Sequence, residues 1–383
     1  MKRLAKMPLS GLSVDEFLAR HWQRRPLLVR AALPADCSPM PVEALLALAG
    51  DDDVESRLVT RAGGRWRLAH GPFDPDALPP RTRRGWTVLV QGVDLHSDDA
   101  ALLRDRFAFL PHARIDDLMI SFATDGGGVG PHVDSYDVFL LQVHGRRRWK
   151  VSRQADLSMV PGLPLKILAR FQPQQEWLLE PGDMLYLPPG WAHDGVAEGE
   201  CMTCSIGFRA PSRLELLRAF LADAADRIDG ADPRFGDAGS ARALHPGAVP
   251  DALRAFTRDA VRGFEPSDRE IDDFLGRFLT EPKPTVFFDP PTRPLGAAAF
   301  ARAASAGGLR LDRRSRMAAD GARAYLNGER VDIPAGPIRR LIARLADERA
   351  LDAQRAAAAL RHPLAPDLLH EWYRAGWLHP LAR

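Results

Sequence analysis

The sequence Pro131-His132-Val133-Asp134 is followed, 59 residues after Asp134, by the final histidine of Leu185-Tyr186-Leu187-Pro188-Pro189-Gly190-Trp191-Ala192-His193. If the first segment is a strand, His132 and Asp134 point to the same side, because residues two apart share a face of a sheet. Two imidazoles and one carboxylate are the ligands of the facial triad that holds non-haem Fe(II) with open coordination positions. His132, Asp134 and His193 are therefore candidate metal ligands and candidate catalytic residues.

A His-x-Asp pair alone is weak evidence for a metal site, since such pairs arise by chance. The segment before His193 is more specific. Glu180-Pro181-Gly182-Asp183 predicts a turn that begins a strand over residues 184–187. Pro188-Pro189-Gly190 then ends this strand, so that His193 is expected at the rim of the sheet.

The sequence around these segments predicts a β-rich domain. Residues 118–208 form short apolar runs separated by glycine and proline, which is typical of a barrel or jelly roll. The expected strands are 118–122, 137–143, 146–151, 175–179, 184–187 and 201–208, preceded by shorter ones at 26–30, 57–60, 65–68 and 86–91. Short helices are expected from Ser13 to about His21 and over 41–49.

Two further strings bear on the site. Gly126-Gly127-Gly128-Val129-Gly130 leads into a strand and lacks the helix of a dinucleotide site, so we interpret it as a turn that gives close access to the metal. In Arg146-Arg147-Arg148-Trp149-Lys150-Val151, strand alternation places Arg147 on the inner face with Trp149 and Val151. A buried arginine needs an anionic partner. That partner is either a structural carboxylate or, favoured by the nearby metal site, an anionic co-substrate.

Beyond residue 211 the periodicity becomes helical. Ser212 with Glu215 and Ser267 with Glu270 are capping boxes, and residues 212–280 are predicted to be a helical module. Proline-rich linkers follow, and Asn327-Gly328 marks a hairpin between 322–326 and 330–333. Three helices, at 338–346, 352–360 and 366–375, complete a pattern compatible with a winged helix. We therefore expect three domains, over residues 1–211, 212–290 and 291–383.

Composition excludes several classes of protein. With 45% hydrophobic and 27% charged residues, the chain is typical of a soluble globular protein. It has neither an apolar run of membrane-spanning length nor a signal-peptide pattern after the basic start at Met1–Lys6, so a cytoplasmic protein is expected. Cys201 and Cys204 have CxxC spacing, but they fall on a strand where they face opposite ways, so two inert cysteines are favoured over a redox or zinc pair.

Charge is distributed unevenly. Residues 291–383 contain 16 arginines, no lysine and 9 acidic residues, which gives +7 against −5 for the remainder. A basic terminal domain suggests a polyanionic partner such as RNA. The alternative is general arginine usage, since the whole chain has 47 arginines and 5 lysines.

At these residues the chain resembles the JmjC/cupin-type 2-oxoglutarate oxygenases and, more narrowly, the bacterial ribosomal oxygenase family, which hydroxylates an arginine of large-subunit ribosomal protein L sixteen. The matching strings are 126–134 with 136–139, 145–149, 182–193 and 205–211, together with Trp22-Gln23-Arg24-Arg25-Pro26. The resemblance implies an α+β protein: a double-stranded β-helix (the cupin or JmjC jelly roll), then a helical dimerisation module and a C-terminal winged-helix-like domain.

The resemblance also implies the cofactors and the site. Fe(II) would be held by His132, Asp134 and His193, and Arg147 would bind the distal carboxylate of 2-oxoglutarate, helped by Ser121, with O₂ as the second co-substrate. The expected partners are a ribosomal protein and a second copy of the chain. The alternatives are histidyl hydroxylation, lysine N-demethylation, or a non-catalytic cupin-fold ribosome-associated protein. Cys204, where an aromatic is expected, and Ala123, where a small polar residue is common, depart from the family pattern and are expected to line the pocket.

Overall fold

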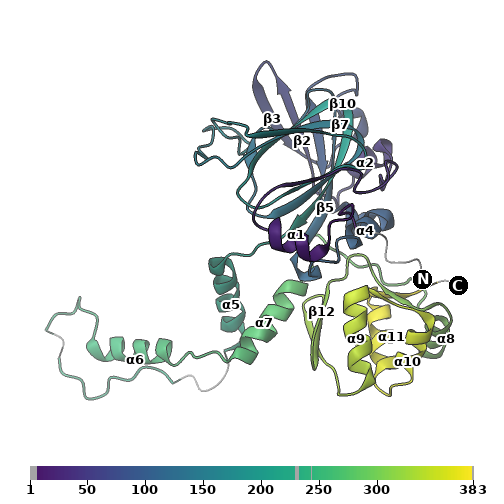
Figure 1. Ribbon diagram of the computed structural model, residues 1–383. Coiled ribbons are helices and arrows are strands. Elements are labelled where there is room, and N and C mark those ends of the chain that lie inside the picture. The colour runs from purple at the N-terminus through teal and green to yellow at the C-terminus, as the bar shows by residue number, and fades with distance from the viewer. Residues whose placement is uncertain (1–6, 229–232, 243, 382–383) are drawn as a thin grey trace.

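The computed structural model describes residues 7–228, 233–242 and 244–381. A β-rich unit forms the N-terminal half of the chain, and a smaller unit of helices and short strands forms the C-terminal part, with helices between them (Figure 1). Among the helices of the described segments, none combines the length and apolar character that a bilayer crossing requires. Met1–Lys6, part of the basic start considered above, lies outside the described residues.

One antiparallel sheet makes up the β-rich unit. Its strands follow the order β1-β9-β7-β10-β5-β4-β2-β3, with β6 added to β10 and β8 added to β7. The bounds are β1 (Leu27–Val29), β2 (Ser56–Ala62), β3 (Arg65–His70), β4 (Trp86–Val90), β5 (Ile115–Ala123), β6 (His132–Val133), β7 (Asp137–Ser152), β8 (Gln175–Leu179), β9 (Met184–Leu187) and β10 (Ala192–Phe208). The predicted cupin-type jelly roll is confirmed.

Two strands differ from the prediction. The expected strands at 137–143 and 146–151 are one strand, β7, which passes through Gly145 at a positive φ of 59°. β10 begins at Ala192 rather than at Cys201, and it pairs with β7 along nearly its whole length. His193 therefore lies on a strand, one residue after its start, and not on a rim loop.

The core of this unit is aromatic. Helix α1 (Val14–Arg20), with Ser13 as its N-cap, places Phe17 against Tyr186 and Phe139. Trp22 stacks on the same two rings. The remaining helices of the unit are α2 (Val42–Leu48), α3 (Val93–His96), α4 (Asp98–Asp105) and the short η1 (Pro75–Ala77) and η2 (His112–Arg114). This packing covers one face of β7 and β9, and the opposite face of β7 lines a cavity.

The helical module consists of α5 (Arg213–Arg227), α6 (Asp251–Arg262) and α7 (Asp268–Thr280). Both predicted capping boxes are present, at Ser212 with Glu215 and at Ser267 with Glu270. Helix α6 lies on an arm that reaches away from both larger units (Figure 1). Helix α7 packs on the C-terminal unit, where its Asp273 accepts hydrogen bonds from Tyr325 and Arg323.

The C-terminal unit combines α8 (Ala297–Gly307), α9 (Pro337–Glu348), α10 (Ala353–Leu360) and α11 (Ala365–Arg374) with two small sheets. One sheet contains β11 (Leu309–Leu311), β15 (Ala350–Leu351) and β16 (Leu378–Pro380), and the other contains β12 (Met317–Asp320), β13 (Arg323–Leu326) and β14 (Glu329–Asp332). The predicted hairpin is confirmed, because Asn327 and Gly328 join β13 to β14 with φ values of 52° and 85°.

Candidate functional site

Strand pairing brings the three predicted metal ligands together. β6 pairs antiparallel with the start of β10, and His132 lies directly opposite His193. The Nε2 atom of His132 is 4.0 Å from Oδ1 of Asp134, and that of His193 is 3.6 Å from Oδ2 of Asp134. One donor atom from each of the three side chains lies within 4.8 Å of the others. This spacing fits three ligands on one face of a single metal ion.

The imidazole rings are oriented by backbone carbonyls. Nδ1 of His132 lies 2.9 Å from the carbonyl oxygen of Gly130, and Nδ1 of His193 lies 2.9 Å from that of Trp191. A carbonyl can only accept, so each Nδ1 carries the proton and each Nε2 keeps its lone pair toward the carboxylate. Burial and, to a smaller extent, the neighbouring His132 lower the pKa of His193 to about 4. The ring is therefore neutral near pH 7, as a metal ligand must be.

The triad lines a cavity of about 620 Å³, within the size range of small-molecule sites. In the wall of this cavity, glycines allow the backbone to pack closely against its neighbours. A Cβ at Gly128 would lie 2.5 Å from the carbonyl oxygen of Gly195, and a Cβ at Gly195 would lie 2.7 Å from the ring of Trp149. The glycine run therefore lets the chain pass against β10 beside the metal ligands, as the sequence predicted.

Arg147 lies in this cavity as a buried cation. It comes from β7, and the alternation argument is confirmed, because Arg147 is buried whereas Arg148 points outward to Glu176 and Glu198. Nη1 of Arg147 donates to the hydroxyl of Ser121 at 3.0 Å. Its Nε and Nη2 are buried and have no partner among the described residues.

The unpartnered nitrogens favour the second of the two interpretations of Arg147, the one with an anionic co-substrate. A structural ion pair would place a carboxylate on the guanidinium, and no salt bridge to Arg147 is present in the described part of the chain. A buried cation whose donors are unsatisfied is costly, whereas a planar guanidinium binds a carboxylate through two parallel hydrogen bonds. The cavity therefore fits an anion that reaches from Arg147 toward the triad.

Two acidic residues that the sequence analysis missed also line the cavity. Asp116 and Asp117 stand near the start of β5, with Tyr136 and Ser205 as neighbours in the wall. Burial raises the pKa of Asp117 to about 6, against a lowering by Lys283. In the sequence, these residues are visible only as two acids at the beginning of an apolar strand. Such pairs of acids are common on protein surfaces.

The two departures from the family pattern do not line the cavity in the described structure. Cys204 lies in the main core, and Ala123 packs with Cys201 and Ala197 in a separate small cluster. Cys201 and Cys204 thus face opposite sides of β10, as their spacing predicted. The expectation that Cys204 and Ala123 contact the pocket is wrong, because Cys204 on β10 and Ala123 on β5 both point into packed apolar clusters.

The structure places all five predicted site residues around one cavity: His132, Asp134, His193, Arg147 and Ser121. The residues present fit a divalent metal, since the donor set is two neutral imidazoles and a carboxylate. They also fit a dicarboxylate, since one anionic end can meet Arg147 while the other lies near the metal ligands.

Comparison with known proteins places this site in a family. Residues 102–216 match the JmjC domain model, and residues 261–379 match a ROXA-like winged helix. The chain is 35% identical over 367 residues to the ribosomal protein uL16 3-hydroxylase of Escherichia coli, covering 92% of this chain and 93% of that protein. A probable ribosomal oxygenase of Haemophilus influenzae is 37% identical over 216 residues, which cover 54% of this chain and 52% of that protein.

Solved structures agree with these relatives. The crystal structure of Escherichia coli YcfD matches with a TM-score of 0.83 and 33% identity, covering 96% of this chain and 98% of that one. YcfD in complex with cobalt and 2-oxoglutarate matches with a TM-score of 0.80 at the same identity and coverage. The chain therefore belongs to the JmjC-domain ribosomal oxygenases, which are 2-oxoglutarate-dependent dioxygenases that require Fe(II) and O₂.

Proposed function

We propose that this protein hydroxylates an arginine side chain of ribosomal protein uL16 in the cytoplasm, with His132, Asp134 and His193 holding Fe(II). The observation that carries the proposal is the buried guanidinium of Arg147, which lies in the same cavity as the triad and has two nitrogens without a partner among the described residues. Support for the target comes from the Escherichia coli relative, which is named a uL16 3-hydroxylase. When bound, Fe(II) with 2-oxoglutarate and O₂ supplies the oxidation that adds one oxygen atom to a C–H bond.

The residues of the chain position the reactants. Arg147 and Ser121 bind the distal carboxylate of 2-oxoglutarate and thereby set its orientation along the cavity. The carbonyls of Gly130 and Trp191 hold the two imidazoles in place before the metal arrives. Such preorganisation keeps the substrate carbon in reach of the reacting centre, which is the main contribution that a protein makes to this type of reaction.

Asp116 and Asp117 favour a cationic substrate side chain. They lie in the wall of the cavity, and two carboxylates attract a guanidinium, which carries a fixed charge and several donors. A lysine substrate would meet the same acids, whereas neutral histidine gains less from them. The acid pair therefore supports arginine hydroxylation over histidyl hydroxylation, and it leaves lysine N-demethylation as the second candidate.

A purified-component assay tests the proposed target. Full-length protein, Fe(II), 2-oxoglutarate and a uL16 fragment are expected to give succinate and a fragment that is heavier by one oxygen atom. Fragments in which each arginine is replaced in turn by lysine identify the modified residue, since one of them should remain unmodified. Loss of a methyl group from an N-methylated lysine fragment, without oxygen on any arginine, would favour the second candidate.

The affinity for substrate is expected to depend on pH through Asp117. Its raised pKa, about 6, means that the carboxylate is ionised at pH 7 and neutral well below pH 6. One pH unit below the pKa about a tenth of the molecules keep the charge, so KM for the uL16 fragment should rise by roughly tenfold. Steady-state kinetics at saturating Fe(II) and 2-oxoglutarate measure this effect.

The control for the pH effect is Asp117→Asn, which cannot ionise. This variant should have a raised KM already at pH 7 and should lose the rise near pH 6. An Asp117→Asn enzyme whose KM still rises with the same midpoint would show that another group is responsible.

We also propose that two copies associate through the helical module. Helix α5 exposes Leu214, Leu217 and Leu221, which repeat at helical spacing, and α7 exposes Ile271 and Leu275. Exposed apolar side chains at helical spacing on a small module are typical of an interface. The division into residues 1–211, 212–290 and 291–383 remains part of this proposal, with the middle segment as the dimer-forming piece.

Light scattering during size-exclusion chromatography tests the dimer. Leu217→Asp with Leu221→Asp is expected to give monomers where the unmodified protein gives dimers, because charges would be buried without partners. Leu102→Asp is the matched control, since Leu102 on α4 is 51% exposed and Leu217 is 53% exposed. Monomers of the unmodified protein at micromolar concentration would contradict the proposal.

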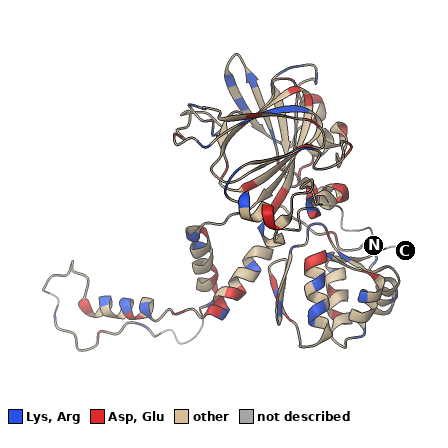
Figure 2. Cartoon of the chain, viewed as in Figure 1, with Lys and Arg blue, Asp and Glu red and all other residues tan. Residues whose placement is uncertain are grey.

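RNA binding by the C-terminal part receives little support. Figure 2 shows acidic and basic segments together across this unit. Many of its arginines are already in ion pairs within the protein, including Arg313 with Asp98, Arg314 with Asp312 and Arg355 with Glu348. Arginines held in this way do not offer a continuous basic face to a phosphate backbone. Part of the positive charge counted from the sequence therefore stabilises the protein's own contacts.

A further inference from the structure

The acid pair of the cavity has a cationic neighbour that comes from a distant part of the chain. Nζ of Lys283, in the linker after α7, lies 3.2 Å from Oδ1 of Asp116 and 3.6 Å from Oδ2 of Asp117. Lysine is rare in this protein, which has 5 lysines against 47 arginines. The contact joins the jelly roll to the segment that leads into the C-terminal unit.

Lys283 contacts Asp117 without lining the cavity itself. Oδ2 of Asp117, the oxygen nearest the ammonium, also accepts the backbone N–H of Gly92 at 3.0 Å. Oδ1 accepts no hydrogen bond among the described residues and lies close to Gly207, which lines the cavity. Oδ2 is thus bound by Lys283 and the backbone of Gly92, while Oδ1 can accept a hydrogen bond from a donor within the cavity.

The charges of this cluster match a guanidinium. Two carboxylates and one ammonium leave a net charge of −1, which a single arginine side chain neutralises. Burial raises the pKa of Asp117, and Asp94 and Asp116 raise it further, whereas Lys283 lowers it. Asp94 is itself paired with Arg104 at 2.8 Å. Lys283 is therefore the cation that favours the ionised acid pair before substrate arrives.

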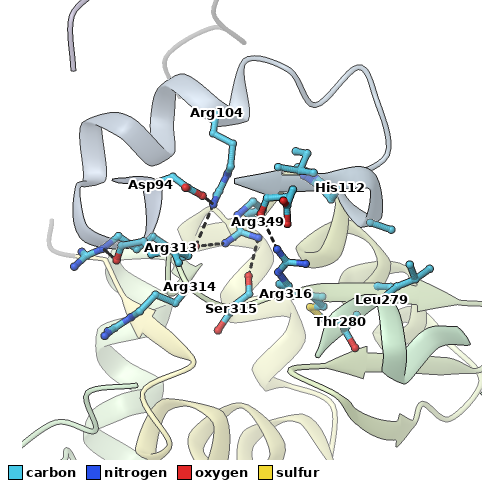
Figure 3. A pocket seen from close by; sticks show the side chains of 16 residues that line it. Asp94, Arg104, His112, Leu279, Thr280, Arg313, Arg314, Ser315, Arg316 and Arg349 are labelled. Carbon is cyan, nitrogen blue, oxygen red and sulfur yellow. Dashed lines mark hydrogen bonds and ion pairs between the residues drawn. The ribbon is translucent and has the colours of Figure 1, made fainter. Parts of the chain in front are cut away.

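Residues that follow α7 in the chain restrain both partners of the contact. Pro282 and Pro284 restrict the backbone on either side of Lys283. Arg316 donates through Nη2 to the carbonyl oxygen of Asp116 at 2.8 Å. Figure 3 shows Arg316 near Thr280 and Leu279 of α7 and next to Arg349, in the lining of a small pocket to which Arg104 and Asp94 also belong. Asp116 lines this pocket as well as the active-site cavity.

We infer that Lys283 is a positioning residue for substrate, which holds Asp116 and Asp117 ready to bind the guanidinium of the target arginine. The inference rests on the proposed function, because it assumes a cationic substrate side chain. It assigns the linker an indirect part in substrate recognition, through the two carboxylates that line the cavity.

Substitution of Lys283 in the full-length protein tests this role. Lys283→Met is expected to raise KM for the uL16 fragment by about fivefold or more, with kcat and KM for 2-oxoglutarate unchanged. Lys283→Arg, which restores a cation, should return KM to within about twofold of the original value. The matched control is Lys150→Met, because Lys150 is 40% exposed against 35% for Lys283 and also pairs with a carboxylate, Glu176, at 3.7 Å.

Binding without turnover gives an independent readout. With Fe(II) and 2-oxoglutarate present and oxygen removed, fluorescence anisotropy of a labelled uL16 fragment should show the same fold-change in Kd. A lower Kd for Lys283→Met would overturn the inference, since it would mean that the lysine competes with substrate. An unchanged Kd, or failure of Lys283→Arg to restore binding, would also overturn it. If the unmodified protein neither binds nor hydroxylates any uL16 fragment, the proposed function itself fails.

Discussion

Replacement of Asp134 by alanine is expected to abolish turnover and to weaken metal binding by at least roughly 100-fold. Asp134 is the only carboxylate among the described residues in the three-ligand cluster, and its two oxygens face Nε2 of His132 and of His193. Without Asp134, two neutral imidazoles remain. They lack the negative charge and the third donor position of the facial triad. Titration calorimetry with cobalt(II) measures the binding, and succinate release measures the turnover.

The control for this substitution is His144→Ala. His144 lies on β7 with an exposed side chain and belongs to no ligand cluster of the described residues. It should bind cobalt(II) and form succinate like the unmodified protein. Metal affinity that survives in Asp134→Ala would show that the ion binds elsewhere.

Replacement of Arg147 by alanine is expected to raise KM for 2-oxoglutarate by roughly 30-fold or more, which corresponds to about 2 kcal/mol for the loss of a buried charge partner. Arg147→Lys should restore only part of the affinity, because an ammonium cannot form two parallel hydrogen bonds with a carboxylate. Ser121→Ala removes one hydrogen bond to the guanidinium, so a smaller rise of about threefold to tenfold is expected. Steady-state kinetics with varied 2-oxoglutarate measure all three.

The neighbouring residue supplies the control. Arg148→Ala removes an arginine that is next in sequence but points outward to Glu176 and Glu198. Its KM for 2-oxoglutarate should stay near the original value. Equal effects at Arg147 and Arg148, or none at Arg147, would contradict the assignment of Arg147 as the co-substrate anchor.

Strand alternation explains why much of the site was predictable. His132 and Arg147 could be assigned to faces because alternation depends only on the backbone and not on the partner strand. Asp134 lies one residue beyond the end of β6, yet its carboxylate still lies near His132. The inward position of Arg147 followed from its neighbours Trp149 and Val151, and both are buried. Local rules also gave the capping boxes at Ser212 and Ser267, since these depend on residues three apart.

Features that depend on distant pairing were not predictable in this way. Residues 192–200 contain two glycines and few β-branched residues, yet they form a strand because β7 pairs with them. His193 was expected at a rim for this reason, whereas pairing places it opposite His132. The contact of Lys283 with Asp116 and Asp117 joins residues far apart in the chain, and no local pattern marks it.

The measurement that tests the central claim most directly is mass spectrometry of ribosomal protein uL16 from three strains of the source organism. One carries the unmodified gene, one lacks it, and one carries the Asp134→Ala variant. We predict one added oxygen atom on a single arginine in the first strain and none in the other two. Full hydroxylation in the strain without the gene, or in the Asp134→Ala strain, would contradict the account.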